Sequence, residues 1–240
     1  MRVFKFCGVN FYEANYSLII KLLIKKGGYV VMPAASALVN IKSNSVYYNA
    51  LKKSTVAIFD SGFFCILLLV LKFLKFEKFS GYKFLKLFFN DKNLKNRRIL
   101  SLDPTAKDSK LNNSYLKFNK FKFIRNYICP IYERNNIKDK HLLILINKYK
   151  PHIILINIAG GLQEPLALYI KNNSNNKLIS ICSGAAISFF TGSQAKINDL
   201  IDNMYLGWLF RILHNPKIIM RVLKSFNLIP LVYFSKPKIM

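Results

Sequence analysis

Apolar residues recur along the chain in two alternating patterns. Short, mostly apolar runs bounded by Gly, Pro or Asp predict buried strands at residues 29–32, 56–59, 99–102, 153–158 and 178–182, and a looser alternation predicts a strand at residues 3–9. Apolar residues three and four positions apart predict helices at residues 17–26, 45–53, 63–76, 82–89, 138–149 and 164–171. Strands and helices in alternation predict an α/β fold, with a Rossmann-like, mainly parallel sheet and helices on both faces.

The pattern changes beyond Gly192. Residues 199–213 and 217–226 have helical spacing, and no strand lies between them. We therefore predict an α/β core at residues 1–198 and a helical, basic, membrane-proximal appendage at residues 199–240. Its cations, including Arg211 and Arg221, suit a phosphate-bearing ligand or an anionic lipid surface, and an ordinary solvated face is the alternative.

The longest apolar run begins at Phe63 and reaches Leu74 only through Lys72. It is too short for a transmembrane helix, which needs about 20 mostly apolar residues. A buried helix is the favoured interpretation, and a segment lying in a membrane interface is the alternative. The polar residues 105–120 receive no assignment.

The chain is strongly basic. Its 37 Lys and Arg against 11 Asp and Glu give a formal net charge of +26. Such a field attracts phosphates, nucleic acid or anionic membranes. The lysines are scattered, however, so general compositional drift explains the excess equally well. Most aromatic residues fall inside apolar runs and no RNA- or DNA-binding signature is present, so nucleic acid is not an expected partner.

The four cysteines, Cys7, Cys65, Cys129 and Cys182, are far apart and form no CxxC pair. Buried reduced thiols are the expectation, which fits a cytoplasmic protein. The first residues lack the long apolar segment and cleavage site of a secretory signal.

Candidate chemistry gathers where strands are predicted to end. Asp60 follows the apolar run at residues 56–59 and precedes Gly62. A carboxylate there can face the crevice beyond a parallel sheet and act as a general base toward a hydroxyl group. Capping of the next helix is the alternative role for an Asp in this position.

Two further strand ends carry small residues. Gly160 and Gly161 precede Gln163 and Glu164, and Gly184 follows Cys182. Glycines at such ends let a phosphate or sugar approach the backbone, and Gln163 and Glu164 can bind sugar hydroxyls. A capped first helical turn is the alternative for the Gln–Glu pair.

Other cofactor signatures are missing from the sequence. It has neither GxGxxG nor a P-loop, which disfavours dinucleotides and ATP. His141, His152 and His214 are far apart, and no DxD pair is present to hold a divalent ion. We therefore expect no metal and no cofactor.

Five blocks in this order resemble the WecG/TagA/CpsF glycosyltransferases. They are Gly8-Val9-Asn10-Phe11, residues 50–54 leading to Asp60-Ser61-Gly62, Lys78-Phe79-Ser80-Gly81, Gly160-Gly161-Leu162-Gln163-Glu164, and residues 206–216 around Trp208. The resemblance spans nearly the whole chain.

The resemblance implies an inverting enzyme that moves an N-acetylmannosamine-like sugar from a UDP-sugar to a polyprenyl-diphosphate-linked saccharide in envelope glycan synthesis. It implies a cytoplasmic protein peripheral to the inner face of the plasma membrane. Asp60 then matches the catalytic base and Lys78 replaces an arginine near the substrate. Gln163 and Glu164 match a donor-site pair, and Arg211 and Arg221 match basic positions that close over the diphosphate.

The sequence departs from the family pattern at several positions besides Lys78, including Ser61 between Asp60 and Gly62, and Gln194-Ala195-Lys196 in place of the family's Arg-Ala-Pro. Met32 and Ala34 stand where the family has threonine and asparagine, and Gly207 stands where it has a glutamate. These replacements imply altered donor recognition. They also leave open a second function, a non-catalytic relative that binds a nucleotide sugar or a partner enzyme.

Overall fold

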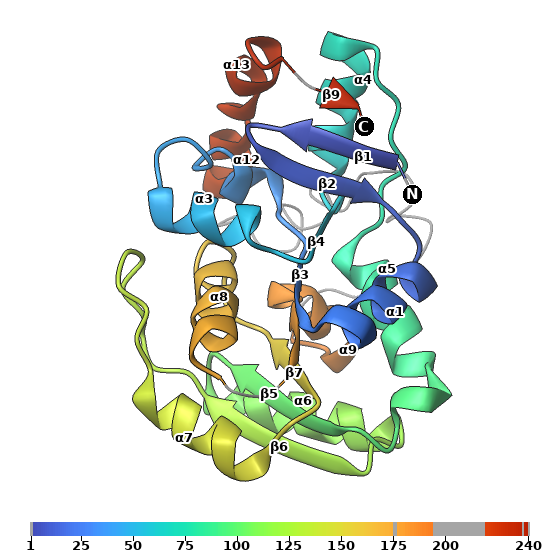
Figure 1. The fold of residues 1–240 in the computed structure, drawn as a ribbon, viewed down its shortest axis with the longest axis vertical. Helices are drawn as coiled ribbons and strands as arrows, with labels where there is room; N and C mark the ends of the chain where they lie inside the picture. Colours follow the sequence, from blue (N-terminus) through green and yellow to red (C-terminus); the bar gives the residue numbers. More distant parts are fainter. Residues whose placement is uncertain (1, 175–176, 194–218, 237, 240) are drawn as a thin grey trace.

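A nine-stranded sheet forms the centre of the molecule (Figure 1). The computed structural model describes residues 2–174, 177–193, 219–236 and 238–239. The strand order is β6-β5-β7-β8-β3-β4-β2-β1-β9. The first seven of these are parallel, and β1 is antiparallel to both β2 and β9. The predicted mainly parallel α/β sheet is confirmed.

The strands and helices have the following bounds. The strands are β1 Arg2–Phe6, β2 Val9–Glu13, β3 Gly28–Val31, β4 Val56–Ile58, β5 Arg98–Asp103, β6 Phe123–Ile128, β7 Ile153–Ile156, β8 Ile179–Cys182 and β9 Lys238–Ile239. The helices are α1 Tyr16–Lys26, α2 Ala35–Leu38, α3 Ser45–Lys52, α4 Gly62–Lys72, α5 Gly81–Asn90, α6 Ala106–Phe118, α7 Lys140–Tyr149, α8 Gln163–Asn173, α9 Ser188–Thr191, α12 Ile219–Ser225 and α13 Leu228–Tyr233. Short 3-10 turns occur at Lys92–Leu94 (η1) and Gly184–Ile187 (η2).

Helices cover both faces of the sheet because successive strand residues point to opposite sides. In β5, Leu100 packs in the cluster with α3, α4, α7, α8 and α13, whereas Ile99 packs in the cluster with α1, α5, α6 and α9. The central strands are buried on both faces, which is why their sequences are mostly apolar. No helix of the described ranges has the length and apolarity that crossing a bilayer requires.

The prediction of one strand over residues 3–9 is wrong, because the chain turns there. Cys7 and Gly8 have φ of 48° and 82°, and two consecutive residues with positive φ make the hairpin turn that matches strand twist. Phe6 then pairs with Val9, and β1 and β2 form an antiparallel hairpin.

Two elements of the core, α6 and β6, lie where no helix or strand was predicted. Residues 105–120 contain α6, which begins at the N-cap Thr105, and residues 123–128 form β6 at the edge of the sheet. The predicted helix at 199–213 lies outside the described residues, and the helix predicted at 217–226 is described from Ile219 as α12.

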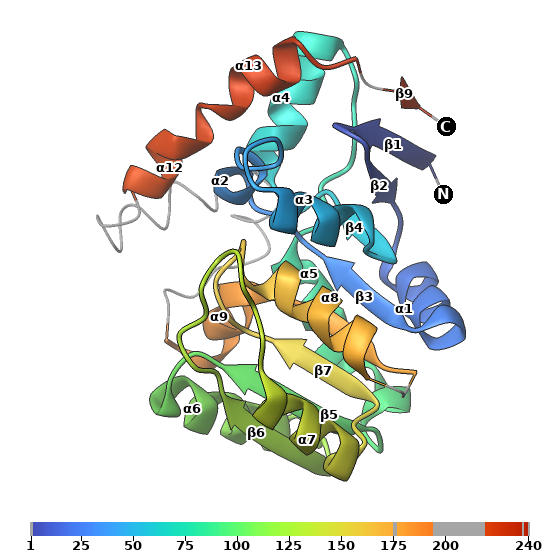
Figure 2. The same cartoon turned by 60° about the vertical axis from the view of Figure 1, so that its left-hand side comes forward.

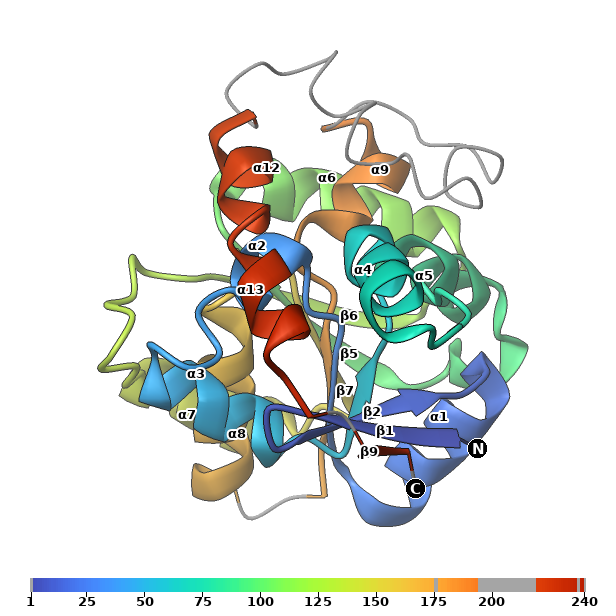
Figure 3. The same cartoon turned by 90° about the horizontal axis from the view of Figure 1, so that it is seen from above.

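The C-terminal helices lie against the core. α12 and α13 contact α2, and α13 also contacts α4 (Figures 2 and 3). Leu228 and Val232 of α13 are fully buried in the main core. β9 then pairs with β1, so both ends of the described chain meet at one edge of the sheet (Figure 1).

Candidate active site

The candidate site is built from the loops that follow the carboxyl ends of the parallel strands. Because β3, β4, β5, β7 and β8 are parallel, the segments that follow them emerge on the same side. Met32 follows β3, Asp60 follows β4, Gly160 and Gly161 follow β7, and Gly184 follows β8. Most of the candidate residues from the sequence analysis therefore lie at the carboxyl ends of these strands.

Asp60 is fixed by the first turn of α5. Its Oδ1 accepts a hydrogen bond from the backbone N–H of Gly81 at 2.6 Å, and the positive end of a helix dipole stabilises a carboxylate placed there. Capping of α4 is done by Ser61 instead, whose Oγ accepts from the N–H of Phe64 at 3.2 Å. The carboxylate of Asp60 thus binds a helix terminus, but of a different helix from the one that capping would predict.

Lys78 lies in the segment that leads into α5, and this segment is tied to the Asp60 loop. The N–H of Phe79 donates to the carbonyl of Phe59 at 2.9 Å. Burial raises the pKa of the Cys65 thiol to about 12, while Lys78 lowers that pKa and Asp60 raises it. Lys78 and Asp60 therefore both lie near the same residue of α4.

Three loops meet at Gly81. A Cβ built on Gly81 would lie 3.3 Å from Met32 Sδ, 3.4 Å from Ala186 Cβ and 3.6 Å from Asp60 Oδ1. Glycine permits this close approach because it has no side chain. The loops after β3, β4 and β8 are consequently packed together beside the Asp60 carboxylate.

Gln163 lies in the first turn of α8 and is 4% exposed. Its Nε2 donates to Glu164 Oε1 at 3.3 Å, whereas its Oε1 is buried and has no hydrogen-bond partner among the described residues. A Cβ on Gly184 would lie 3.4 Å from Gln163 Nε2 and 3.5 Å from its Oε1. A buried acceptor without a partner costs free energy, so Gln163 Oε1 is suited to receive a donor from a ligand.

Glu164 holds the glycine loop. Its Oε2 accepts from the N–H of Gly161 at 2.7 Å, which closes the first turn of α8. Glu164 is fully buried, and this burial raises the pKa of its carboxyl to about 7, against hydrogen bonds that lower it. Gly160 packs near Ala37, while no atom of the described part of the chain lies within 4 Å of a Cβ placed on Gly161.

The η2 turn connects the two halves of the site. At one end Gly184 lies against the Gln163 amide, and two residues later Ala186 lies against Gly81, which holds Asp60. Arg221 is exposed on α12, and α12 contacts α2 just beyond β3. Arg211 lies outside the described residues.

A buried polar network at Asp103 was missed by the sequence reasoning. Asp103 is fully buried, and its Oδ1 accepts from Ser101 Oγ at 2.8 Å, Asn112 Nδ2 at 2.7 Å and Asn157 Nδ2 at 2.8 Å. Its Oδ2 accepts from Asn126 Nδ2 at 2.9 Å. One carboxylate therefore joins β5, β6, α6 and the loop after β7.

This network reaches the site through Asn157. The Asn157 Oδ1 accepts a hydrogen bond from Ser183 Oγ at 2.8 Å, and Ser183 directly precedes Gly184. Asp103 thereby anchors the loops that carry the two glycine segments. The Asp-Pro step at residues 103–104 marked a strand end in the sequence, but nothing there indicated the amide donors that surround it.

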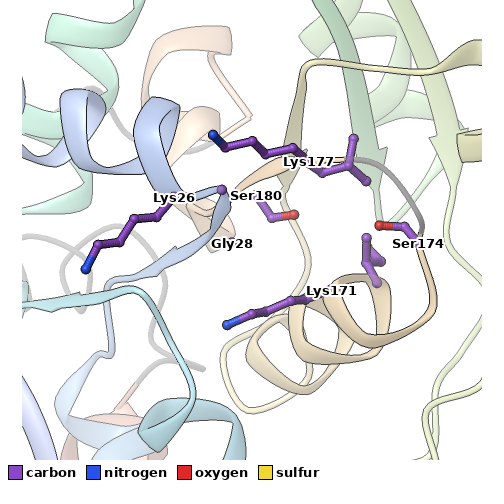
Figure 4. Close-up of a pocket in the computed structure, with 9 residues that line it drawn as sticks. Lys26, Gly28, Lys171, Ser174, Lys177 and Ser180 are labelled. Carbon is purple, nitrogen blue, oxygen red and sulfur yellow. The ribbon is translucent and has the colours of Figure 1, made fainter.

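A separate cavity lies at the opposite ends of the strands, beside the first residues of β3 and β8 (Figure 4). It measures about 140 Å³ and is lined by Lys26, Lys171 and Lys177 together with Gly28, the first residue of β3. Lys26 and Lys171 lie at the C-terminal ends of α1 and α8, where cations stabilise the helix dipole. Their placement is thus explained by helix termination, and we do not assign the site to this cavity.

The four cysteines form no disulfide, and Cys65, Cys129 and Cys182 are buried while Cys7 is half-buried. Within residues 2–174, 177–193, 219–236 and 238–239, no three His, Cys, Asp or Glu side chains are grouped as metal ligands would be.

Residues 4–238 match the family model described as the glycosyl transferase WecG/TagA/CpsF family. No curated protein matches the chain. The match covers nearly the whole sequence, including every loop of the candidate site.

Proposed function

Since the chain belongs to the WecG/TagA/CpsF glycosyltransferase family, we propose that it transfers an N-acetylmannosamine-like sugar from a UDP-sugar to a polyprenyl-diphosphate-linked saccharide. The family places the chain among glycosyltransferases of cell-envelope glycan synthesis. The donor, the acceptor lipid and a location at the cytoplasmic face of the membrane are part of the proposal.

Asp60 is the proposed general base. Its carboxylate takes the proton of the acceptor hydroxyl, the hydroxyl oxygen attacks the anomeric carbon, and the bond from that carbon to the diphosphate breaks with inversion. UDP leaves with the electron pair. The hydrogen bond from Gly81 supports this role, because it fixes one carboxylate oxygen at a helix N-terminus.

Donor binding is proposed for the other half of the site. The unpartnered Gln163 Oε1 accepts a hydrogen bond from a hydroxyl or N–H group of the donor, and the open backbone at Gly161 admits its diphosphate. Lys78, Arg211 and Arg221 supply the positive charge that stabilises departing UDP.

One observation carries the proposal: the η2 turn contacts both the Gln163 amide and the Gly81 residue that binds Asp60. A donor held at Gln163 is therefore next to the loop that presents the base.

Met32 favours a second candidate, a non-catalytic relative that binds a nucleotide sugar or a partner enzyme. Met32 is 4% exposed, and its thioether sulfur lies beside Gly81, next to the Asp60 carboxylate. An apolar group there cannot make the hydrogen bonds of the threonine that the family pattern contains.

The test combines thermal shift and transfer. We expect UDP or one UDP-sugar from a panel to raise the midpoint of thermal unfolding, and transfer to a short lipid-diphosphate acceptor. Asp60→Asn, whose Oδ1 still accepts from Gly81, should lower the rate by about 10²- to 10⁴-fold and leave the UDP shift intact. Binding of UDP with neither transfer nor slow UDP release would establish the non-catalytic candidate.

A glycine pair tests the donor half separately. Gly184 and Gly192 both have positive φ, 54° and 80°, but only Gly184 lies against Gln163. Alanine at either position carries a similar backbone cost of about 1–2 kcal/mol. We expect only Gly184→Ala to reduce the UDP-induced shift, and equal shifts in the two variants would argue against Gln163 as a donor ligand.

A further inference from the structure

Helix α4 carries an apolar face that points away from the core. Ile66, Leu69, Val70 and Phe73 at the end of the helix are 41%, 48%, 62% and 90% exposed. The opposite face, with Phe64 and Leu68, is buried. A surface helix normally presents polar residues to water, so this outward face differs from that of an ordinary surface helix.

A second apolar surface lies beside it on α12 and α13. Its exposed members are Ile219, Met220, Leu223, Phe226, Ile229, Tyr233 and Phe234. The two surfaces join, because the rings of Phe63 and Phe226 are 5.5 Å apart and Lys72 Nζ donates to the carbonyl of Tyr233 at 2.7 Å. Figure 2 shows α13 running alongside α4.

Together these elements hold 11 of the 20 exposed large hydrophobic residues in the described part of the chain. Contiguous exposed apolar surface of this kind marks a protein or membrane contact. The charged residues of these elements distinguish a protein contact from a membrane contact.

Residues 62–75 and 219–236 contain five cations, Lys72, Lys75, Arg221, Lys224 and Lys236, and no carboxylate. A two-fold contact with a second copy would place these cations against the same cations, which is unfavourable. Anionic lipid offers both the apolar layer and the compensating charge.

We propose that the outward face of α4 docks on anionic membrane, forming one surface with α12 and α13. Only the role of this docking, which is to bring the enzyme to a lipid-linked acceptor, rests on the proposed function. The docking itself depends on the exposed residues alone.

The position of α4 gives this contact a catalytic consequence. The helix begins immediately after Asp60 and Ser61. Its 11 residues span about 16 Å, so docking through this face keeps Asp60 within about one helix length of the lipid surface. A diphosphate-linked acceptor sits at headgroup level, within the range that this geometry serves.

The test uses exposed point variants rather than truncation, because Leu228 and Val232 are buried in the core and β9 pairs with β1. The α4 variant is Val70→Gln with Phe73→Gln. The matched control is Phe118→Gln with Ile131→Gln, which removes two side chains that are 81% and 103% exposed on other elements. Sedimentation with phosphatidylglycerol–phosphatidylcholine vesicles measures the membrane-bound fraction.

We expect the wild-type chain and the control to bind these vesicles equally, and the α4 variant to bind at least tenfold more weakly. Vesicles of phosphatidylcholine alone should bind all three weakly. Unchanged binding of the α4 variant, or no binding of the wild-type chain to anionic vesicles, would overturn the proposal. So would a wild-type dimer in vesicle-free light scattering that the α4 variant dissociates.

The UDP-induced thermal shift separates this proposal from the proposed function. Asp60→Asn should bind vesicles like the wild-type chain. If vesicle binding depends on α4 but no UDP-sugar shifts the unfolding midpoint, docking stands and the proposed donor fails. If UDP binds and α4 is irrelevant to vesicles, the reverse holds.

Discussion

Asp103→Asn should destabilise the protein strongly although it changes a single atom type. In the folded chain Asp103 is fully buried and accepts four hydrogen bonds from Ser101, Asn112, Asn126 and Asn157. In the variant, Oδ1 keeps three neutral donors, and an NH₂ group replaces Oδ2 opposite Asn126 Nδ2. Two donors then face each other at the one position where the carboxylate had accepted.

The magnitude follows from the number of bonds. A hydrogen bond to a charged group contributes about 1.5–3 kcal/mol, against about 0.5–1.5 kcal/mol for a neutral one. Weakening four bonds by about 1 kcal/mol each gives about 4 kcal/mol, and relief of charge burial offsets part of this. We expect the free energy of unfolding to fall by about 3 kcal/mol.

Urea unfolding of the full chain at neutral pH measures this change, and thermal unfolding should show a midpoint lowered by about 6–12 °C. Asp108→Asn is the matched control, because Asp108 lies in the first turn of α6 and bonds to the N-cap Thr105 at the surface. It should cost about 1 kcal/mol or less. A loss below about 1 kcal/mol for Asp103→Asn would refute the view that this carboxylate organises the loops.

Three other predictions concern single positions. Burial raises the folded-state pKa of Glu164 from 4.5 to about 7, so its contribution to stability is full below pH 4.5 and declines as pH rises toward 7. The free energy of unfolding of Glu164→Gln, measured in urea, should therefore gain about 3 kcal/mol relative to wild type over that pH range. Parallel pH profiles of the two proteins would contradict this. Gly28→Ala should cost several kcal/mol by the same measurement, because φ is 92° and the new Cβ would lie 2.2 Å from Thr55 Oγ1; a near-neutral effect would mean that β3 shifts freely. Ser61→Ala removes the N-cap of α4 and should cost about 1 kcal/mol, and a thermal midpoint equal to that of wild type would show that another group replaces the cap.

The central strands could be predicted because they are buried on both faces. β3, β5, β7 and β8 are mostly apolar runs whose ends coincide with Gly, Pro or polar residues. Edge strand β6 could not, since it is half exposed and Phe123 and Ile128 are each 52% exposed. Its pairing with β5, rather than its own pattern, makes it a strand.

Helix α6 escaped prediction for a reason that bears on the site. Two of its three inward positions are Ser109 and Asn112, and Asn112 faces inward to bind Asp103. Because these inward positions are polar, the sequence of α6 lacks the apolar spacing that predicts a helix. Reading Asp60, Gln163 and Gly184 as strand-end residues was enough to place them at one edge, whereas the link between them through Ala186 and Gly81 required the folded structure.

The pairing of β9 with β1 governs how the first strand meets other molecules. Ile239 lies opposite Phe4 and Lys238 opposite Lys5, so a two-residue strand covers part of an edge that would otherwise present unsatisfied backbone groups. Open strand edges recruit strands from other chains, and lysines at an edge resist such addition. Removal of residues 238–239 should therefore convert this border into a template for ordered aggregation, well before it weakens the core.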